Sequence, residues 1–256
     1  MHITVLIENT APDGTLFHEH GLSLHLSYEG HSILLDAGAT GRSVQNAQAL
    51  GIDVSAVEAA VLSHGHDDHA DGFSAFFACN PSALVYARPA ITQPYYLPDQ
   101  QDGQKFIGVN PALLARYQDR FSLADGPRVI LPGLHLIPDP VVHEQSLVAE
   151  TEQGLVIFNS CCHAGADAVV ESVLNYLPGR PVRALIGGFY LMGSTGTCSL
   201  GPSPQAVTAL AARLAEELGV AEIYTGHCTG QPALALLEQA LPGRVHRLTS
   251  GLTISL

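Results

Sequence analysis

Basic residues are scarce in this 256-residue chain. Lysine and arginine together number 11 against 24 aspartates and glutamates, which gives a net charge of −13 at pH 7 with histidine neutral. A surface with so few cations offers no footprint for a phosphate backbone and is repelled by anionic membranes. We therefore expect neither nucleic acid nor a membrane surface among its partners.

Long apolar runs are missing as well. No stretch approaches the roughly 18 apolar residues of a membrane-spanning helix, and the first residues, MHITVLIENTAPDG, lack the basic start and long apolar core of a signal peptide. The five cysteines are an odd number in a mid-sized chain, which suits reduced thiols better than a disulfide framework. These absences favour a cytoplasmic protein.

Several familiar sequence signatures are also absent. The chain has no G-x-S-x-G sequence that would present a serine nucleophile, and no Gly-rich phosphate loop of the GxGxxG or GK[ST] kind. It has no Ser/Gly-rich linker, charge block or low-complexity run that would mark a boundary. We therefore expect one domain over residues 1–256. We also expect its functional residues to lie in motifs other than these.

The apolar pattern predicts a mixed fold. Hydrophobic residues make up 46% of the chain and charged residues 14%, as in a compact globular protein. HITVLIE, LSLHLSYEG and HSILLDAG predict an antiparallel start, and SLVAE and GLVIFN predict a hairpin across Thr151 to Gln153. Helices are expected from Arg42 to Leu50 and from about Pro204 to Leu218. Two strand-rich halves, each followed by helices, indicate two sheets packed face to face with helices outside.

The segment SHGHDDH follows the apolar run AAVL and holds four potential metal ligands within six positions, namely His64, His66, Asp68 and His69. Histidine nitrogen and carboxylate oxygen bind zinc and similar divalent ions. His64 and His66 lie two apart on an extended segment, so their side chains leave the same side and can share one ion. Asp68 and His69 can then reach a second ion close by. The pattern predicts a metal site at the carboxyl end of a strand.

Two ions require more donors than this segment supplies. His163 in NSCCHAG and His227 in YTGHCTG both follow strand-like runs and supply candidates from distant strand ends. A catalytic zinc keeps one coordination position open and lowers the pKa of its bound water to about 7. We therefore expect two divalent ions, with zinc favoured and manganese or iron as alternatives.

SHGHDDH is the signature of the metallo-β-lactamase superfamily, which the chain thus resembles. EHGLS, LLDAG, CCHAG, GGFYLMG and TGHCTG, in that order, resemble the branch of metal-dependent hydrolases that includes the dihydropterin ribofuranosyl-aminobenzene phosphate synthase-like proteins. The resemblance covers most of the chain. It implies an α/β (α+β) fold, the four-layer αββα sandwich, with a binuclear metal site at one edge.

The same resemblance implies which residues hold the metals. One ion would be bound by His64, His66 and His163, and the other by Asp68, His69 and His227. It also implies that Asp36, in LLDAG, is a buried carboxylate that orients the histidine loop. The alternative for Asp36 is a turn cap.

One departure from the superfamily bears on the ligand set. Many members have a carboxylate that bridges the two ions after the second hairpin, where this chain reads FNSCCHAG. Cys161 is a candidate for that place, since coordination deprotonates thiols; a buried bystander is the alternative. His143 lies about where the wider superfamily has its third ligand, and it competes with His163 for the first ion. We favour His163, because the closer branch shares it.

The predicted function is a binuclear metal-dependent hydrolase, in which a metal-bound hydroxide attacks an ester, lactone, amide or phosphoester. Asp68 would orient the hydroxide, and His20 in EHGLS is a candidate for proton transfer or substrate contact, with a structural role as the alternative. A phosphoribosyl-type transferase or synthase acting on a pterin precursor is a second hypothesis, since one fold serves many chemistries. A third is a non-enzymatic metal or redox sensor that uses Cys161, Cys162 and Cys228.

The segment from Arg88 to Arg128 interrupts the alternation of strand and helix with prolines at 89, 94, 98 and 111. It carries five of the 11 basic residues of the chain and five aromatic ones: Tyr95, Tyr96, Phe106, Tyr117 and Phe121. Aromatic walls and cations suit an anionic, partly planar small molecule. We predict a lid-like insertion at about residues 88–128, with a solvated loop or a dimer contact as the alternative. A homo-oligomer is thus left open.

Overall fold

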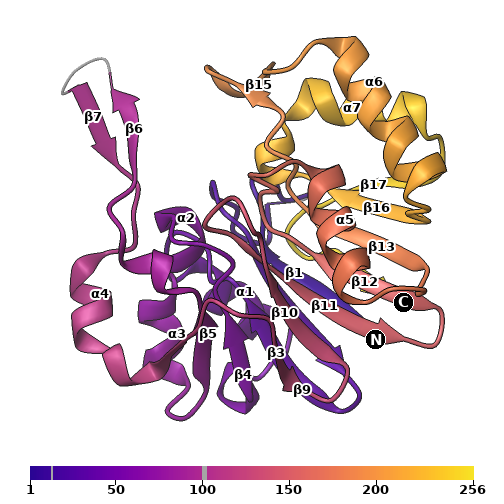
Figure 1. Cartoon of the computed structure of the whole chain (residues 1–256). Coiled ribbons are helices and arrows are strands. Elements are labelled where there is room, and N and C mark those ends of the chain that lie inside the picture. Colours follow the sequence, from indigo (N-terminus) through magenta and orange to yellow (C-terminus); the bar gives the residue numbers. More distant parts are fainter. Residues whose placement is uncertain (13, 100–102) are drawn as a thin grey trace. The chain divides into compact units, whose positions relative to one another are not determined.

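The computed structural model describes residues 1–12, 14–99 and 103–256. The chain forms two compact units, the first comprising residues 1–125 and 249–256 and the second residues 126–248. Each unit has its own seven-stranded sheet and its own hydrophobic core (Figure 1). The single domain expected over residues 1–256 stays a prediction.

The sheet of the first unit is antiparallel on one side and parallel on the other. In spatial order its strands are β18 (Thr253–Ser255), β1 (His2–Ile7), β2 (Ser23–Tyr28), β3 (His31–Leu35), β4 (Ala59–Val61), β5 (Leu84–Ala87) and β8 (Phe121–Leu123). Pairs from β18 to β3 are antiparallel, which confirms the predicted antiparallel start, and pairs from β3 to β8 are parallel. Because β3 and β4 run in the same direction, their carboxyl ends meet at one edge of the sheet.

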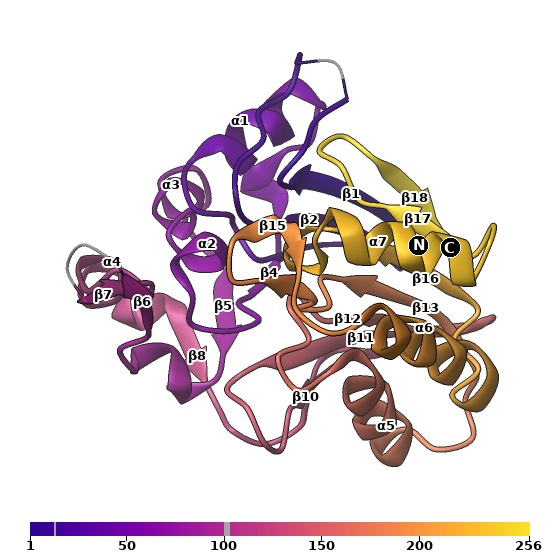
Figure 2. The same cartoon turned by 90° about the horizontal axis from the view of Figure 1, so that it is seen from above.

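Helices and helical turns connect these strands. They are α1 (Arg42–Ala49), η1 (Val54–Ala56), α2 (Asp67–Ala70), α3 (Phe73–Cys79), η2 (Pro89–Thr92), α4 (Pro111–Arg116) and η3 (Gln118–Arg120). Helix α1 confirms the helix predicted before Gly51, whose φ of 74° ends it in the left-handed region. Phe73, Phe76 and Phe77 of α3 are buried among apolar residues of β4 and β5. Helices α1, α2 and α3 lie along one side of the strands (Figure 2).

The segment from Arg88 to Arg128 is largely built into the first unit. Ile91, Val109 and Leu113 are buried in its core, and β8 is an edge strand of its sheet. Among the described residues of the segment, the hairpin of β6 (Tyr96–Asp99) and β7 (Gly103–Phe106) projects as an arm (Figure 1). Residues 100–102 lie outside the described residues. The lid-like insertion at about residues 88–128 stays a prediction, and the hairpin is the part of it that projects from the core.

The sheet of the second unit repeats the same combination of pairings. In spatial order its strands are β17 (Val245–Arg247), β16 (Glu222–Thr225), β13 (Val182–Gly187), β12 (Gly154–Phe158), β11 (Gln145–Thr151), β10 (Leu134–Pro138) and β9 (Arg128–Leu131). Strands β9 to β12 pair antiparallel and β12 to β17 parallel. The hairpin predicted across Thr151 to Gln153 is confirmed as β11 and β12. The start of β11 and the end of β12 consequently lie at one edge.

Helices cover one face of this second sheet (Figure 2). The elements besides the sheet are α5 (Ala166–Tyr176), α6 (Pro204–Ala212), the π-helical turn η4 (Arg213–Glu217), η5 (His227–Thr229), α7 (Gln231–Ala240) and the small hairpin of β14 (Met192–Gly193) and β15 (Gly196–Leu200). Helix α6 begins at Pro204, where the Ser203 hydroxyl accepts from the Ala206 N–H. Among the described residues, no helix is long and apolar enough to cross a membrane.

Candidate metal centre

Asp36 organises the loop that carries the histidine cluster. It follows β3 directly, is fully buried and has a φ of 55°. The Ser63 N–H donates to Asp36 Oδ1 at 2.7 Å, and the Ser63 hydroxyl donates to Oδ2 at 2.7 Å. His69 Nδ1 lies 2.7 Å from the same Oδ2 and is assigned as the protonated nitrogen, because a carboxylate only accepts. His69 Nε2 is then the nitrogen that can bind a cation.

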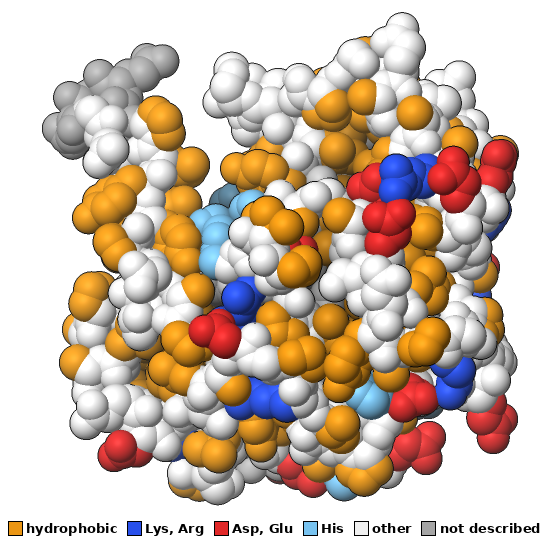
Figure 3. Space-filling view, in the orientation of Figure 1, with side chains coloured by type: hydrophobic (Ala, Val, Ile, Leu, Met, Phe, Trp, Pro, Cys, Tyr) orange, Lys and Arg blue, Asp and Glu red, His pale blue; other side chains and the backbone are white. Residues whose placement is uncertain are grey.

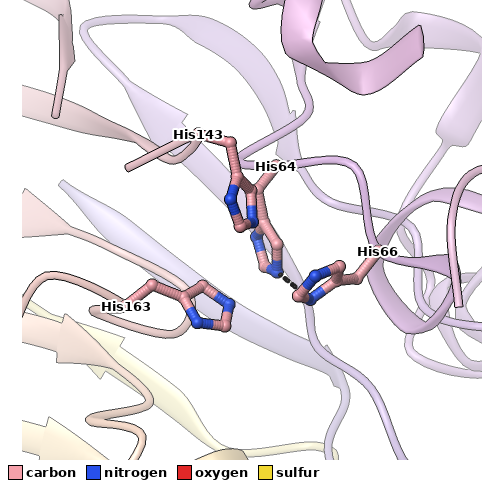
Figure 4. A group of neighbouring side chains, drawn as sticks. All are labelled: His64, His66, His143 and His163. Carbon is pink, nitrogen blue, oxygen red and sulfur yellow. Dashed lines mark hydrogen bonds between the residues drawn. The ribbon is translucent and has the colours of Figure 1, made fainter. Parts of the chain in front are cut away.

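The histidine rings of this loop lie together. His64 Nε2 is 3.0 Å from His66 Nδ1, as drawn in Figure 4, and the ring centroids of His64 and His69 are 4.4 Å apart. Ser63 Oγ lies 2.9 Å from His64 Nδ1, which directs Nε2 toward His66. Two nitrogens that share a tetrahedral zinc at about 2.0–2.1 Å are about 3.3 Å apart. The His64 and His66 nitrogens are close to that separation, so this pair fits a divalent ion.

Asp68 is placed between two histidines of the same unit. Its Oδ2 is 3.3 Å from His20 Nε2 and 3.6 Å from His69 Nε2. Asn9 Nδ2 lies 3.4 Å from His20 Nδ1, so both ring nitrogens of His20 face polar atoms. A Cβ on Gly21 would lie 2.4 Å from the Asp68 carbonyl oxygen, which explains why a glycine follows His20 here. The His20 side chain is 55% exposed, so it connects Asp68 to solvent.

Two further carboxylates make the loop strongly acidic. Burial raises the pKa of Asp67, and the neighbouring charge of Asp68 raises it further. Burial also raises the pKa of Asp71, whose Oδ1 accepts from the Asn110 N–H at 2.9 Å. The negative charge of Asp68 next to Asp67 favours a cation bound at this loop.

The second unit presents donors of its own at the ends of its strands. The ring centroids of His143 and His163 are 5.1 Å apart, and their nearest nitrogens lie within 4.8 Å (Figure 4). Cys161, His227 and Cys228 form a second group with ligand atoms within 4.8 Å of one another, and all three are buried. The sequence offers His143 and His163 as alternative ligands of the first ion, and the fold brings their two rings side by side.

Glu144 was missed in the sequence, although it holds the NSCCHAG loop. It is buried, and its Oε1 accepts from the Cys161 N–H at 2.7 Å while its Oε2 accepts from the His163 N–H at 2.9 Å. The available signal was an acidic residue between His143 and the apolar strand QSLVA. Glu144 thus supports its loop from the start of β11 as Asp36 supports the histidine loop from the end of β3.

The buried cysteines Cys162 and Cys228 differ in their surroundings. Burial, followed by the charge of Glu144, raises the pKa of Cys162 well above its usual range. Cys228 Sγ accepts from the Tyr190 N–H at 3.3 Å and lies 3.6 Å from the Cys161 carbonyl oxygen, to which its S–H can donate. Cys161 as a metal ligand stays a prediction.

Two mixed seven-stranded sheets with flanking helices define a known fold class. Tm1679, a metal-dependent hydrolase of the beta-lactamase superfamily, matches with a TM-score of 0.79 and 23% identity over 100% of this chain and 99% of its own. The Zn(2+)-bound PqqB from Methylobacterium extorquens matches with a TM-score of 0.61 and 16% identity over 100% of both chains. The predicted αββα metallo-β-lactamase fold is confirmed.

Family membership follows from the sequence match. The family model described as the Metallo-beta-lactamase superfamily matches residues 23–174, more than half of the chain, and the chain belongs to this superfamily. It is also similar to the 7,8-dihydropterin-6-methyl-4-(beta-D-ribofuranosyl)-aminobenzene-5'-phosphate synthase of Methanocaldococcus jannaschii. The two are 25% identical over 269 residues, which cover 91% of this chain and 88% of that protein.

Proposed function

We propose that this protein is a binuclear metal-dependent hydrolase that acts on a small molecule with an ester, lactone, amide or phosphoester group. The supporting observation is the 3.0 Å approach of His64 Nε2 to His66 Nδ1, in a loop that Asp36 holds in place. Membership of the metallo-β-lactamase superfamily also supports a metal-dependent enzyme. The proposed ligands are His64, His66 and His163 for one ion and Asp68, His69 and His227 for the other.

Zinc or a similar ion bound by these residues would supply Lewis acidity and lower the pKa of a water to about 7. The chain itself supplies orientation and a proton path. Asp68 can hold a proton at Oδ2, which lies 3.3 Å from His20 Nε2, and the exposed His20 ring can pass it to solvent. Asp36 keeps His69 in the tautomer whose Nε2 is available to a ligand.

We propose further that the arm formed by β6 and β7 contacts the substrate. Tyr96 and Phe106 are exposed, and their ring centroids lie 5.5 Å apart at 71°. In Figure 3 hydrophobic side chains gather on this arm below the grey atoms. Lys105, on the same arm, is exposed, and its positive charge offsets part of the rise that burial and Asp68 cause in the pKa of Asp67. These features suit an anionic, partly planar molecule.

A second candidate function is supported by the synthase of Methanocaldococcus jannaschii, which is similar over 91% of this chain. On this hypothesis the same metal centre serves the transfer of a phosphoribosyl-type group to a pterin precursor. Incubation with a phosphoribosyl donor and a pterin acceptor, followed by product analysis, distinguishes it from hydrolysis. A covalent adduct of the two would favour the synthase, and release of the hydrolysed donor alone would favour the hydrolase.

Metal analysis of protein purified without chelator tests the centre directly. We expect about two divalent ions per chain, and His66→Ala is expected to lose one ion and nearly all activity on an ester, lactone and phosphodiester panel. His31→Ala is a matched control, because His31 lies in the same unit with its ring bonded to Glu58. If His66→Ala retains both ions, the assignment of His66 as a metal ligand is wrong.

A further inference from the structure

Tyr95 packs against the metal loop between its first two histidines. The ring centroids of Tyr95 and His66 lie 5.2 Å apart at an angle of 82°. A Cβ on Gly65 would lie 2.9 Å from Tyr95 Cε2 and 2.9 Å from Ile91 Cα, closer than real Cβ contacts. The glycine therefore lets Tyr95 and Ile91 close directly onto the turn between His64 and His66.

Tyr95 is itself held in place on two sides. Its hydroxyl donates to the Ala90 carbonyl oxygen at 3.0 Å. Its carbonyl oxygen accepts from the Ile107 N–H at 2.9 Å, and the Ile107 carbonyl oxygen accepts from the Asp67 N–H at 2.8 Å. The base of the arm is thus hydrogen-bonded both to Tyr95 and to the metal loop.

The contact also limits how the His66 ring can turn. With Tyr95 against it, His66 presents Nδ1 to His64 Nε2 at 3.0 Å. A histidine that must be ordered by the ion loses side-chain freedom on binding, which weakens the affinity. Removal of a residue that orients a metal ligand without binding the metal itself typically lowers the metal affinity about 10–100-fold.

We propose that Tyr95 is a positioning residue for His66, and that its ring, anchored through its hydroxyl to Ala90, sets the affinity of the ion that His66 binds. The inference rests on the proposed function, since it takes His66 as a ligand. It adds a residue that lies outside the ligand set and belongs to the segment from which the arm projects.

Titration of the metal-free protein with Co2+, followed by the visible absorption of the bound ion, tests this proposal. Tyr95→Leu is expected to weaken Co2+ binding about tenfold or more and to alter the band shape of the ion that His66 holds. Tyr95→Phe keeps the ring but loses the bond to Ala90, so its affinity should fall between those of Tyr95→Leu and the natural protein. Tyr96→Leu is the matched control for Co2+ binding, because the adjacent residue Tyr96 is 51% exposed.

The outcomes separate this inference from the proposed function. A folded Tyr95→Leu protein that binds Co2+ with unchanged affinity and spectrum would overturn the role of Tyr95. If His66→Ala, titrated in parallel, also binds Co2+ unchanged, then His66 is no ligand and the proposed metal centre fails as well. Should Tyr95→Leu not fold, as judged by circular dichroism, Tyr95→Met fills the same space with a flexible chain and serves for the same comparison.

Discussion

Asp36 Oδ2 lies 2.7 Å from His69 Nδ1, and both side chains are fully buried. The contact joins the ends of two neighbouring parallel strands, because Asp36 follows β3 and the histidine loop follows β4. Three donors reach the Asp36 carboxyl group, which holds its position and fixes the tautomer of His69.

Asp36→Asn should separate this orienting role from packing. The amide keeps the shape of the carboxylate, but its NH2 group would replace an accepting oxygen and face either the Ser63 N–H or both the Ser63 hydroxyl and His69 Nδ1. We expect a folded protein that loses the ion at His69 or binds it about 10–100-fold more weakly, measured by metal analysis and thermal unfolding. Asp53→Asn is the control, since Asp53 is a carboxylate that caps another turn. Unchanged metal content in Asp36→Asn would show that Asp36 is only structural.

Glu144→Gln should disturb the NSCCHAG loop in a comparable way. One amide oxygen can replace one carboxylate oxygen, but the NH2 group then opposes the N–H of Cys161 or His163. A buried N–H left without its acceptor costs about 1–3 kcal/mol, which we expect as a lower free energy of unfolding. Glu150→Gln, at the other end of β11, is the control in denaturant unfolding and metal analysis. Equal losses in the two variants would contradict a special role for Glu144.

The two histidines of the second unit can be compared directly. His163 lies in the NSCCHAG loop, where Glu144 holds its backbone N–H, and His143 lies outside this loop. We therefore expect His163→Ala to lose the first ion and His143→Ala to retain it. Metal stoichiometry by mass spectrometry of the intact protein is the measurement. The reverse result would make His143 the ligand and His163 its neighbour.

The aromatic pair of the arm should affect substrate binding more than metal binding. Replacing both Tyr96 and Phe106 with serine removes two exposed rings that contact each other and leaves the buried residues of the unit in place. We expect KM to rise about tenfold or more with both ions retained, because a planar group that stacks on one of the two rings gains about 1–3 kcal/mol. Leu123→Ser, which removes an exposed apolar side chain from β8, is the control. Kinetics unchanged in the double variant would rule out substrate contact by this pair.

Cysteine labelling tests the sensor hypothesis. Because burial raises the pKa of Cys162, its thiol form is favoured in the folded protein. The contribution of the Cys162 thiol to the free energy of unfolding is therefore complete below the pKa of an unfolded cysteine, about 8.5. It is lost as the pH rises above that value toward the raised pKa of the folded protein. We expect iodoacetamide at pH 7 to 8 to modify the exposed Cys79 and Cys198 and to spare the three buried thiols, as read by peptide mass spectrometry. Rapid labelling of Cys161 or Cys162 would instead support a redox role.

The sequence by itself determined the features that depend on neighbours along the chain. An apolar strand followed by SHGHDDH places several ligand types within one short loop, and the turn after HSILL provides the buried Asp36. The strands and hairpins were also predictable from short stretches of sequence. Alternation of apolar and polar residues and short turns can be recognised without knowing which distant segment pairs with the strand.

Tertiary structure alone decided the parts that depend on pairing between distant segments. Glu144 has no motif of its own, and it reaches the N–H groups of Cys161 and His163 because β11 pairs antiparallel with β12. The prolines and aromatic residues predicted a lid-like insertion at about residues 88–128, and only the folded structure shows that Ile91 and Leu113 of this segment are buried in the core of the first unit. Tyr95 likewise meets His66 only because Gly65 leaves space for its ring. Close packing selects these contacts by shape, and shape is a property of the folded chain.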